Sequence, residues 1–326
     1  MARYALKGEV MGYIFGPVPS RRLGLSLGVD LVPKKTCSFD CIYCQVGRTT
    51  RLTATPTDLH PVDRVLAELR ERLKEVTPDA VTLSGSGEPT LHKGIGRVIA
   101  SVKEMTDTPV VLLTNGSLLS REEVRARVKD ADRVAPTLCS VHEATFRRIH
   151  RPHRSLRSME VIDGLKRFRS EYAGRLTLEV FLLKGINDTP EELEGLRRCI
   201  TEISPDSVQL NTVARPPSER TALPLDSQRL EEIREFLGER VEVIADYRGR
   251  RRSRRRKTLD ETVREMVGRR PVRLKDIAET LGIGLEETQR VVEGLEQAGS
   301  VKAETHQGET YYLSGSKEGR PGDFPG

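Results

Sequence analysis

Short apolar segments alternate with longer amphipathic segments between residues 25 and 244. The apolar segments have the length and composition of buried strands, and the amphipathic segments carry apolar residues at helical spacing. The first amphipathic segment also begins with a proline, which favours a helix start. We predict strands at 25–31, 80–84, 109–113, 133–138, 176–183, 207–210 and 241–244, and helices at 61–76, 93–105, 121–129, 190–203 and 226–238.

Repeated alternation of strand and helix predicts a parallel sheet with right-handed crossovers, and therefore an α/β fold. Polar and glycine-rich sequences follow the strands rather than precede them. In parallel barrels the active site lies at the carboxyl ends of the strands. The chain has about six strand–helix units, so we expect a partial (β/α)6 barrel over residues 1–247 rather than a closed eightfold barrel.

A second, smaller unit is expected after the barrel. Three helical patterns are followed by two strand patterns, an order typical of a winged helix, which we predict for residues 258–314. The glycine- and proline-rich residues 315–326 indicate a disordered tail. The helical patterns cover 259–268, 274–281 and 285–298, and the strand patterns cover 300–304 and 309–313.

The positive charge of the chain is concentrated in one run. The formal net charge is +6, yet residues 248–257 alone hold seven Arg and one Lys. Residues 258–326 hold nine basic and thirteen acidic side chains. We interpret 248–257, from Arg248 to Lys257, as an Arg-rich linker that could neutralise several phosphates of RNA. A solvated linker or a partner-docking segment is the alternative.

The cysteines point to metal ligation rather than to disulfides. Their number is odd, three of the five lie within eight residues, and the N-terminal residues MARYALKGEV lack the apolar core of a secretion signal. Free thiols are typical of a reducing compartment. No stretch approaches the roughly 18 apolar residues of a membrane span. We therefore expect a cytoplasmic protein with no membrane contact.

The sequence TCSFDCIYC places Cys37, Cys41 and Cys44 on one loop after the first predicted strand. Three thiolates can bind three irons of a [4Fe–4S] cubane and leave the fourth iron open for chemistry. Two other interpretations stay open on the loop alone. One is a zinc site completed by a distant histidine, and the other is a fully ligated electron-transfer cluster.

Polar motifs also follow the next two predicted strands. In Gly87-Glu88-Pro89 the glycine allows close approach of the backbone to a ligand. The carboxylate can bind an ammonium group through a charge-assisted hydrogen bond. Thr114 and Asn115 carry short polar side chains that suit ribose hydroxyls or a carboxylate.

These three motifs at successive strand ends resemble the radical S-adenosylmethionine (SAM) superfamily. The resemblance implies a [4Fe–4S] cluster on the three cysteines, SAM on the unique iron, and an electron donor of ferredoxin or flavodoxin type. It further implies reductive cleavage of SAM to a 5′-deoxyadenosyl radical that removes a hydrogen atom from the substrate. The residues that it implies for SAM binding are Tyr43, near the adenine, and Gly87, Glu88, Pro89, Thr114 and Asn115.

Later strand ends carry further candidates. Asn187 and Asn211 are candidates for adenine or substrate contacts. Cys139 stands where related enzymes usually have Asp; it could donate a hydrogen atom, although a buried inert thiol is the more common case. Arg151 could clamp a carboxylate or phosphate. The nearby histidines do not have metal-ligand spacing and are expected at solvated positions; they are His142, His150 and His153.

From GPVPSRRLGLSLGVDL to LNTVARPP, roughly residues 12–245, the chain resembles Fe–S oxidoreductases related to the tRNA wyosine synthases. Those synthases carry additional N-terminal cysteines for a second cluster, whereas residues 1–36 contain none. The resemblance implies modification of RNA, in particular tRNA, but does not extend to wyosine formation.

The C-terminal unit offers two alternatives to RNA. Its predicted recognition helix, 285–298, carries four glutamates and a single arginine, which does not suit a phosphate-lined groove. A peptide or protein substrate held by the winged helix is therefore the second hypothesis. The third is a non-enzymatic Fe–S redox regulator that binds DNA; the motifs for SAM argue against it.

Overall fold

A computed structural model describes residues 12–244 and 259–315 of the chain. Its main feature is one eight-stranded sheet with the order β1-β2-β5-β6-β7-β8-β9-β10. Neighbours from β2 to β10 pair in parallel, and β1 is antiparallel to β2. The strands are β1 Ile14–Ser20, β2 Gly24–Val29, β5 Ala80–Leu83, β6 Val110–Thr114, β7 Arg133–Leu138, β8 Arg175–Leu182, β9 Ser207–Thr212 and β10 Val241–Val243.

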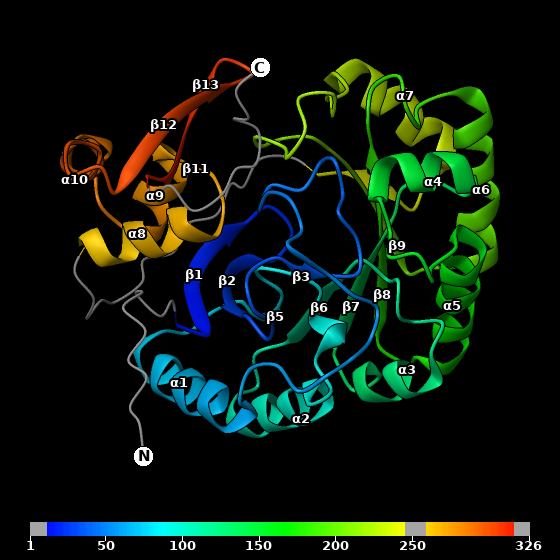
Figure 1. Ribbon diagram of the computed structural model, residues 1–326, viewed down its shortest axis with the longest axis horizontal. Coiled ribbons are helices and arrows are strands. Elements are labelled where there is room, and N and C mark those ends of the chain that lie inside the picture. Colours follow the sequence, from blue (N-terminus) through cyan, green and yellow to red (C-terminus); the bar gives the residue numbers. More distant parts are fainter. Residues whose placement is uncertain (1–11, 245–258, 316–326) are drawn as a thin grey trace.

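Helices cover the outside of this curved sheet, and the strands surround a common interior (Figure 1). The apolar faces of strands and helices share one continuous core. The edge strands β1 and β10 do not pair with each other within the described residues, so the predicted α/β partial barrel is confirmed. The helices are α1 Val62–Glu75, α2 Ile95–Met105, α3 Glu122–Val128, α4 Glu143–His150, α5 Ser158–Glu171, α6 Pro190–Ile203 and α7 Ser227–Leu237.

Each predicted strand and helix of the barrel is present, with ends that differ by at most two residues. Strand β1 was not predicted. Its sequence, IFGPVPS, contains Pro17 and Pro19, and proline argues against a strand inside a sheet. Here β1 lies at the edge, and its register shifts between Phe15 and Val18. An edge position with an irregular register tolerates proline because fewer ladder hydrogen bonds are required.

The C-terminal residues form a second unit with a three-stranded antiparallel sheet of order β11-β13-β12. The predicted helices and hairpin are all present, and β11 was not predicted. The predicted linker 248–257 and the tail from residue 316 lie outside the described residues. The elements are α8 Leu259–Arg269, β11 Val272–Arg273, α9 Leu274–Leu281, α10 Leu285–Gln297, β12 Val301–His306 and β13 Glu309–Ser314.

This unit packs against the barrel rather than standing apart from it. Val18 of β1 is part of the C-terminal hydrophobic core. On the other side, Gln307 Nε2 donates to the carbonyl of Val213 (2.9 Å) and Tyr311 Oη donates to that of Ala214 (2.6 Å), both just after β9. The unit therefore contacts both strand β1 and the segment that follows strand β9. None of the described helices combines the length and apolarity needed to cross a bilayer.

Candidate active site

The loop that carries Cys37, Cys41 and Cys44 follows β2 and begins with a two-residue strand, β3 (Thr36–Cys37), paired with β4 (Arg51–Leu52). The Cys44 amide donates to the carbonyl of Cys41 (3.1 Å), which closes a turn between the last two thiols. All three cysteines are half-buried and free. The structure thus places three unpaired thiols on one tightened loop above the carboxyl ends of the strands.

Each of these sulfurs has a nitrogen neighbour. Lys35 Nζ donates to Cys44 Sγ (3.3 Å), and Asn115 Nδ2 donates to Cys37 Sγ (3.6 Å). The Nδ1 atom of His150 lies 3.2 Å from Cys41 Sγ. Hydrogen bonds to sulfur are a recurrent means by which proteins tune iron–sulfur clusters.

The raised pKa values of two of these thiols indicate that a bound cation would be needed to keep them ionised. Burial, and then the neighbouring Glu88, raise the pKa of Cys37 to about 12. Burial also raises the pKa of Cys41 well above its usual range, and Cys37 and Cys44 add to the effect. A bound metal stabilises thiolates that would otherwise stay protonated. The loop therefore fits a metal cofactor chemically.

Within the described residues, no three His, Cys, Asp or Glu side chains converge closely enough to hold one metal ion. A cubane does not require such convergence, because each cysteine binds its own iron. The thiols on this loop therefore suit a [4Fe–4S] cluster, and the nitrogen donors around them suit its sulfur ligands.

The GSGEP loop after β5 packs directly on the cysteine loop. A Cβ at Gly87 would lie 1.9 Å from the carbonyl oxygen of Thr36, so glycine permits this approach. The Glu88 amide donates to the same carbonyl (3.1 Å), and the Lys35 amide donates to the carbonyl of Ser86 (2.8 Å). Pro89 opens a short 3₁₀ turn, Pro89–Leu91, that ends the loop.

Glu88 is buried and connects this loop with the end of β6. Its Oε1 accepts from the hydroxyls of Thr114 (2.6 Å) and Thr90 (2.7 Å) and from the Thr90 amide (3.1 Å). Its Oε2 accepts the Asn115 amide (2.8 Å), which leaves that oxygen acceptor capacity. Burial raises the pKa of Glu88, and these hydrogen bonds oppose the shift. Glu88 can therefore accept one more donor through Oε2.

Thr114 and Asn115 support the cysteine loop from β6. The Thr114 hydroxyl donates to Glu88 and accepts the Gly116 amide (3.1 Å), so it is already engaged. Asn115 Nδ2 donates to the hydroxyl of Ser38 (2.8 Å) in addition to Cys37. Both residues therefore hold Glu88 in place, and Asn115 also holds Cys37.

Tyr43 points inward from the cysteine loop. Its ring stacks on Phe181 of β8 with centroids 4.0 Å apart, and its hydroxyl lies 3.6 Å from Cys139 Sγ. Cys139 is buried at the end of β7, and burial, despite the hydrogen bond to Tyr43, raises the pKa of its thiol. The structure thus places the buried Cys139 thiol next to the Tyr43 hydroxyl.

The two asparagines predicted at later strand ends differ. Asn187 is fully buried, and its Nδ2 donates to the carbonyls of Cys139 (2.7 Å) and Phe181 (2.9 Å). Its Oδ1 accepts the Leu183 amide (2.7 Å). These bonds use both amide protons, so Asn187 shapes the strand ends and does not present a donor to a ligand, contrary to our expectation.

Asn211 faces the barrel interior and belongs to a network that sequence reasoning missed. Glu179 of β8 accepts from Asn211 Nδ2 (2.8 Å) and Thr137 Oγ1 (2.8 Å) and pairs with Arg22 Nη1 (2.9 Å). Burial alone would raise the pKa of Glu179, but Arg22, Asn211 and Thr137 lower it overall. The signal for it was the single acidic residue in the apolar strand LTLEVFLL.

The structure bears on two predictions in the segment FRRIHRPH. His150 is not solvated; it is buried against Phe39 and Phe146, because α4 turns its aromatic face inward. Burial lowers the pKa of His150 to about 3. Arg151 donates to Glu219 Oε1 (2.8 Å), so within the chain it already clamps a carboxylate.

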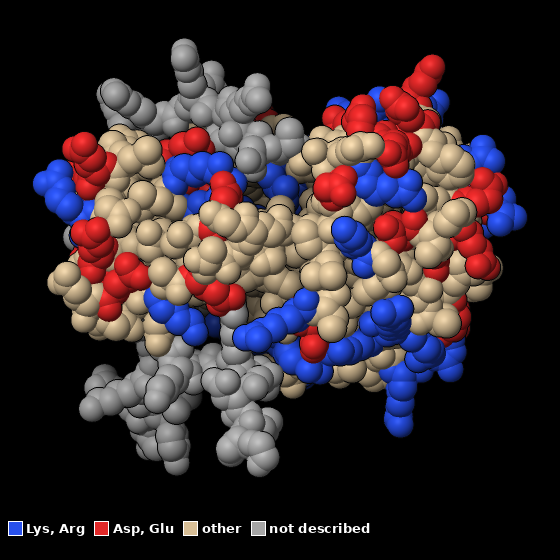
Figure 2. Space-filling view, turned by 90° about the horizontal axis from the view of Figure 1, so that it is seen from above, with Lys and Arg blue, Asp and Glu red and all other residues tan. Residues whose placement is uncertain are grey.

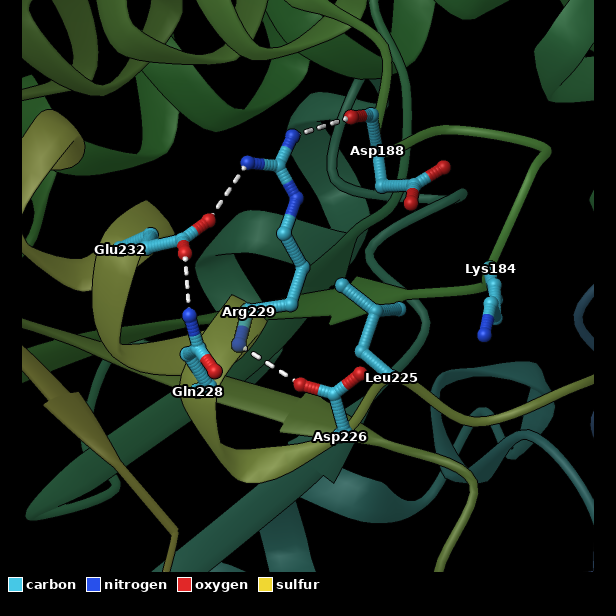
Figure 3. Close-up of a pocket in the computed structure, with 7 residues that line it drawn as sticks. All are labelled: Lys184, Asp188, Leu225, Asp226, Gln228, Arg229 and Glu232. Atoms are coloured by element: carbon cyan, nitrogen blue, oxygen red, sulfur yellow. Dashed lines mark hydrogen bonds and ion pairs between the residues drawn. The ribbon is translucent and has the colours of Figure 1, made fainter.

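A surface cavity of about 350 Å³ lies between the loop after β8 and the start of α7 (Figure 3). Its polar groups largely pair with one another: Arg229 contacts the Glu232 carboxylate (3.0 Å) and the carbonyl of Asp188 (3.0 Å), and the Asp226 carboxylate caps α7. None of its lining residues belongs to the cysteine loop or to the motifs around it. This cavity is therefore not the candidate site.

Residues 31–199 match the family described as the radical SAM superfamily, and the chain belongs to it. It is therefore an enzyme whose cofactors are a [4Fe–4S] cluster and SAM, as predicted. More narrowly, a UPF0026 protein of Methanocaldococcus jannaschii is 37% identical over 66% of this chain and 67% of its own length, which places the chain among the UPF0026 proteins.

A protein named GTPase Obg from Brachyspira hyodysenteriae is 35% identical over 92% of this chain, but the chain spans only 45% of that protein. The RNA methyltransferase RlmN of Pelobacter propionicus is 27% identical over 53% of the chain and 50% of its own length. A solved structure of TYW1 with a lysine-pyruvate adduct shares the fold (TM-score 0.50, 16% identity, 68% of this chain, 75% of that chain).

Proposed function

We propose that Cys37, Cys41 and Cys44 each bind one iron of the [4Fe–4S] cluster and that SAM occupies the fourth. The observation that carries this proposal is that three free thiols, each with a nitrogen neighbour, lie on one loop that packs against the loops after β5 and β6. When bound, the reduced cluster would supply the electron for cleavage of SAM into methionine and a 5′-deoxyadenosyl radical able to remove a hydrogen atom from the substrate. An external ferredoxin- or flavodoxin-type protein would supply the electron. We also propose a cytoplasmic location, because free thiols are typical of a reducing compartment.

The chain's own residues would orient SAM beside this cluster. The open position of Glu88 Oε2 suits the ammonium group of the methionyl moiety. Gly87 and Pro89 shape that loop, and Thr114 and Asn115 hold Glu88. Tyr43 offers an aromatic surface at the adenine side.

We propose RNA, in particular tRNA, as the substrate. Support comes from the sequence similarity to an RNA methyltransferase and from the Arg-rich segment 248–257. Viewed from above, Lys and Arg side chains also form a band along the lower edge of the described surface, whereas Asp and Glu gather at the upper right (Figure 2).

The C-terminal unit favours a second candidate. Its order of helices and antiparallel strands is that of a winged helix. We propose that it is a domain of its own, whose boundary with the barrel along the sequence lies near residues 248–257. Its helix α10 carries Glu286, Glu287, Glu293 and Glu296 but only Arg290 as a basic residue. That acidity favours a basic peptide or protein as the alternative substrate.

The cofactor assignment is tested by anaerobic reconstitution. Wild type should bind a [4Fe–4S] cluster and, when reduced, convert SAM to 5′-deoxyadenosine. Alanine at Cys37, Cys41 or Cys44 should abolish both. The matched control is Cys199→Ala, a buried thiol on α6 within the barrel core, which should retain both. An intact cluster that never cleaves SAM would contradict the assignment.

The substrate class is tested in cells. The modified nucleosides of total RNA from a deletion strain are compared with those of the wild type and of strains complemented with wild type or Cys37→Ala. RNA modification predicts loss of one nucleoside that only the wild-type gene restores. Identical nucleoside profiles would favour the peptide alternative.

A further inference from the structure

The C-terminal unit brings arginines to the open side of the barrel. Arg270 follows α8 directly, and Arg215 lies in the segment after β9 that the C-terminal hairpin contacts. Arg21 and Arg22 lie in the turn between β1 and β2 and reach Asn211 (3.4 Å) and Glu179 (2.9 Å) in the barrel interior. The β1–β2 turn, the segment after β9 and the added unit therefore contribute guanidinium groups to one region.

Among the described residues, Arg215 and Arg270 share one carboxylate as their nearby counter-charge. Asp276 is the carboxylate that offsets the charges of both Arg215 and Arg270. It is already held by Arg273, with Nη2 and Nε at 3.1 and 3.2 Å. Its distance to Arg215 Nη2 is 3.9 Å. Arg273 also pairs with Glu309 (2.9 Å), and Arg22 has Glu179 as its own partner. Among the described residues, Arg215 and Arg270 therefore depend on a carboxylate that Arg273 already holds.

This imbalance has an electrostatic cost. The Arg215 side chain is 13% exposed, and burial together with the nearby Arg270 lowers its pKa to about 9. Burial also lowers the pKa of Arg270, partly offset by Asp276, with Arg21 and Arg22 acting in the same direction as burial. Buried cations without enough counter-charge are unfavourable. A bound anion would remove this penalty.

The region also adjoins the cluster loop. Arg215 Nη1 donates to Oε1 of Gln45 (3.3 Å), the residue after Cys44. An anion held by Arg215 and Arg270 would therefore lie at the open side of the barrel beside the candidate active site. A planar guanidinium matches the oxygens of phosphate with two parallel hydrogen bonds.

We propose that Arg215 and Arg270, with Arg21 at the rim, bind a phosphate group of the substrate at the open side of the barrel. The proposal deepens the proposed function, on which its catalytic meaning rests. The phosphate could belong to an RNA backbone or to a small phosphorylated metabolite. Both share the same recognition chemistry, and the test separates them.

The test measures binding to the full chain without its cluster, so that it does not depend on SAM chemistry. Inorganic pyrophosphate is titrated by calorimetry, and a fluorescent 12-nucleotide single-stranded RNA by anisotropy. Arg215→Gln with Arg270→Gln should weaken phosphate binding roughly tenfold or more. The control, Arg197→Gln with Arg234→Gln, removes the same charge from partly exposed arginines of α6 and α7 and should leave binding unchanged.

The two sources of phosphate give different outcomes. If the site holds RNA, the double variant weakens RNA binding and flattens the salt dependence of log K by about 1.4, the slope of two single-strand contacts. If the site holds a small metabolite, pyrophosphate affinity falls and RNA affinity does not. Unchanged affinity for both probes in a folded double variant would overturn the proposal. Should the double variant fail to fold, Arg270→Gln alone, at a half-buried side chain, applies the same criterion.

A failure of the proposed function gives another pattern. Chain that binds phosphate through these arginines but never cleaves SAM would keep the site and reject the cofactor assignment. Chain that cleaves SAM, but binds both probes equally well as wild type and as variants, would keep the cofactor assignment and reject the phosphate site.

Discussion

Arg269 and Asp30 form an ion pair across the junction between the C-terminal unit and the barrel, with Nη1 and Oδ2 2.7 Å apart and side chains only 5% and 7% exposed. The same carboxylate accepts the amide (3.1 Å) and the hydroxyl (2.5 Å) of Ser86 in the GSGEP loop. Arg269 also packs over the ring of Phe15, 4.3 Å from its centroid. The C-terminal unit is therefore connected to the proposed SAM loop through a single carboxylate.

Removing one partner of this pair should be strongly destabilising. Arg269→Met would leave Asp30 as an uncompensated buried charge, and we expect the free energy of unfolding to fall by about 3–5 kcal/mol. Urea denaturation measures this change. Arg97→Met is the matched control, because Arg97 pairs with Asp63 at the surface, where an ion pair contributes about 0–1 kcal/mol. An equal, small loss in both variants would show that the junction pair is not stabilising.

Gly87 should tolerate no side chain, because a Cβ there would meet the main chain of Thr36 at 1.9 Å. We expect Gly87→Ala to destabilise the protein by about 1–3 kcal/mol and to lower the iron bound on reconstitution. Gly294→Ala, in helix α10 with no atom within 4 Å of its Cβ, should instead stabilise by about 0.5–1 kcal/mol. Full cluster loading in Gly87→Ala would show that the two loops can separate.

The sequence alone was sufficient to predict much of the barrel and the position of the proposed cluster loop. The period of apolar residues is a local signal, and Cys37, Glu88 and Asn115 each follow a strand whose end could be located. Parallel strands place such ends at one edge. Contacts between remote residues carried no local signal. Arg269 and Asp30 are 239 positions apart, and their pairing depends on how the C-terminal unit packs on β1.

Local chemistry also misled where packing decided the outcome. Asn187 follows a strand, as a ligand-binding residue would, yet its amide turns to the main chain of β7 and β8. His150 lies in a highly basic segment, yet neighbouring aromatic rings bury it. The polarity of the surrounding sequence did not predict the burial of His150. Its burial is decided by which face of helix α4 turns toward the barrel.

Glu88→Gln tests the SAM contact separately from the cluster. The substitution keeps the size of the side chain but removes its charge and places an amide among the donors of Thr90, Thr114 and Asn115. We expect SAM affinity to fall roughly tenfold or more, because a hydrogen bond to a charged group contributes about 1.5–3 kcal/mol. Equilibrium dialysis with radiolabelled SAM measures it, and iron content should stay near wild type.

The control for that variant is Glu191→Gln, at an exposed position in the first turn of α6. It should bind SAM as wild type does. If Glu88→Gln also keeps full SAM affinity, the carboxylate acts only as a support for Thr114 and Asn115, and the methionyl group must bind elsewhere.

His150 should affect the cluster without binding it. Its Nδ1 is 3.2 Å from Cys41 Sγ, and burial lowers its pKa to about 3, so the ring is neutral near pH 7. A thiolate sulfur can only accept, and therefore Nδ1 must carry the proton and donate to Cys41 when the cluster is bound. Donation to a cluster sulfur stabilises the reduced form.

His150→Phe keeps an aromatic ring in the same pocket and removes the donor, so the reduction potential should become more negative. Redox titration followed by electron paramagnetic resonance measures the potential, and Phe146→Leu, a change in the same aromatic cluster without a sulfur contact, should leave it unchanged. An unaltered potential in His150→Phe would mean that the ring only fills space.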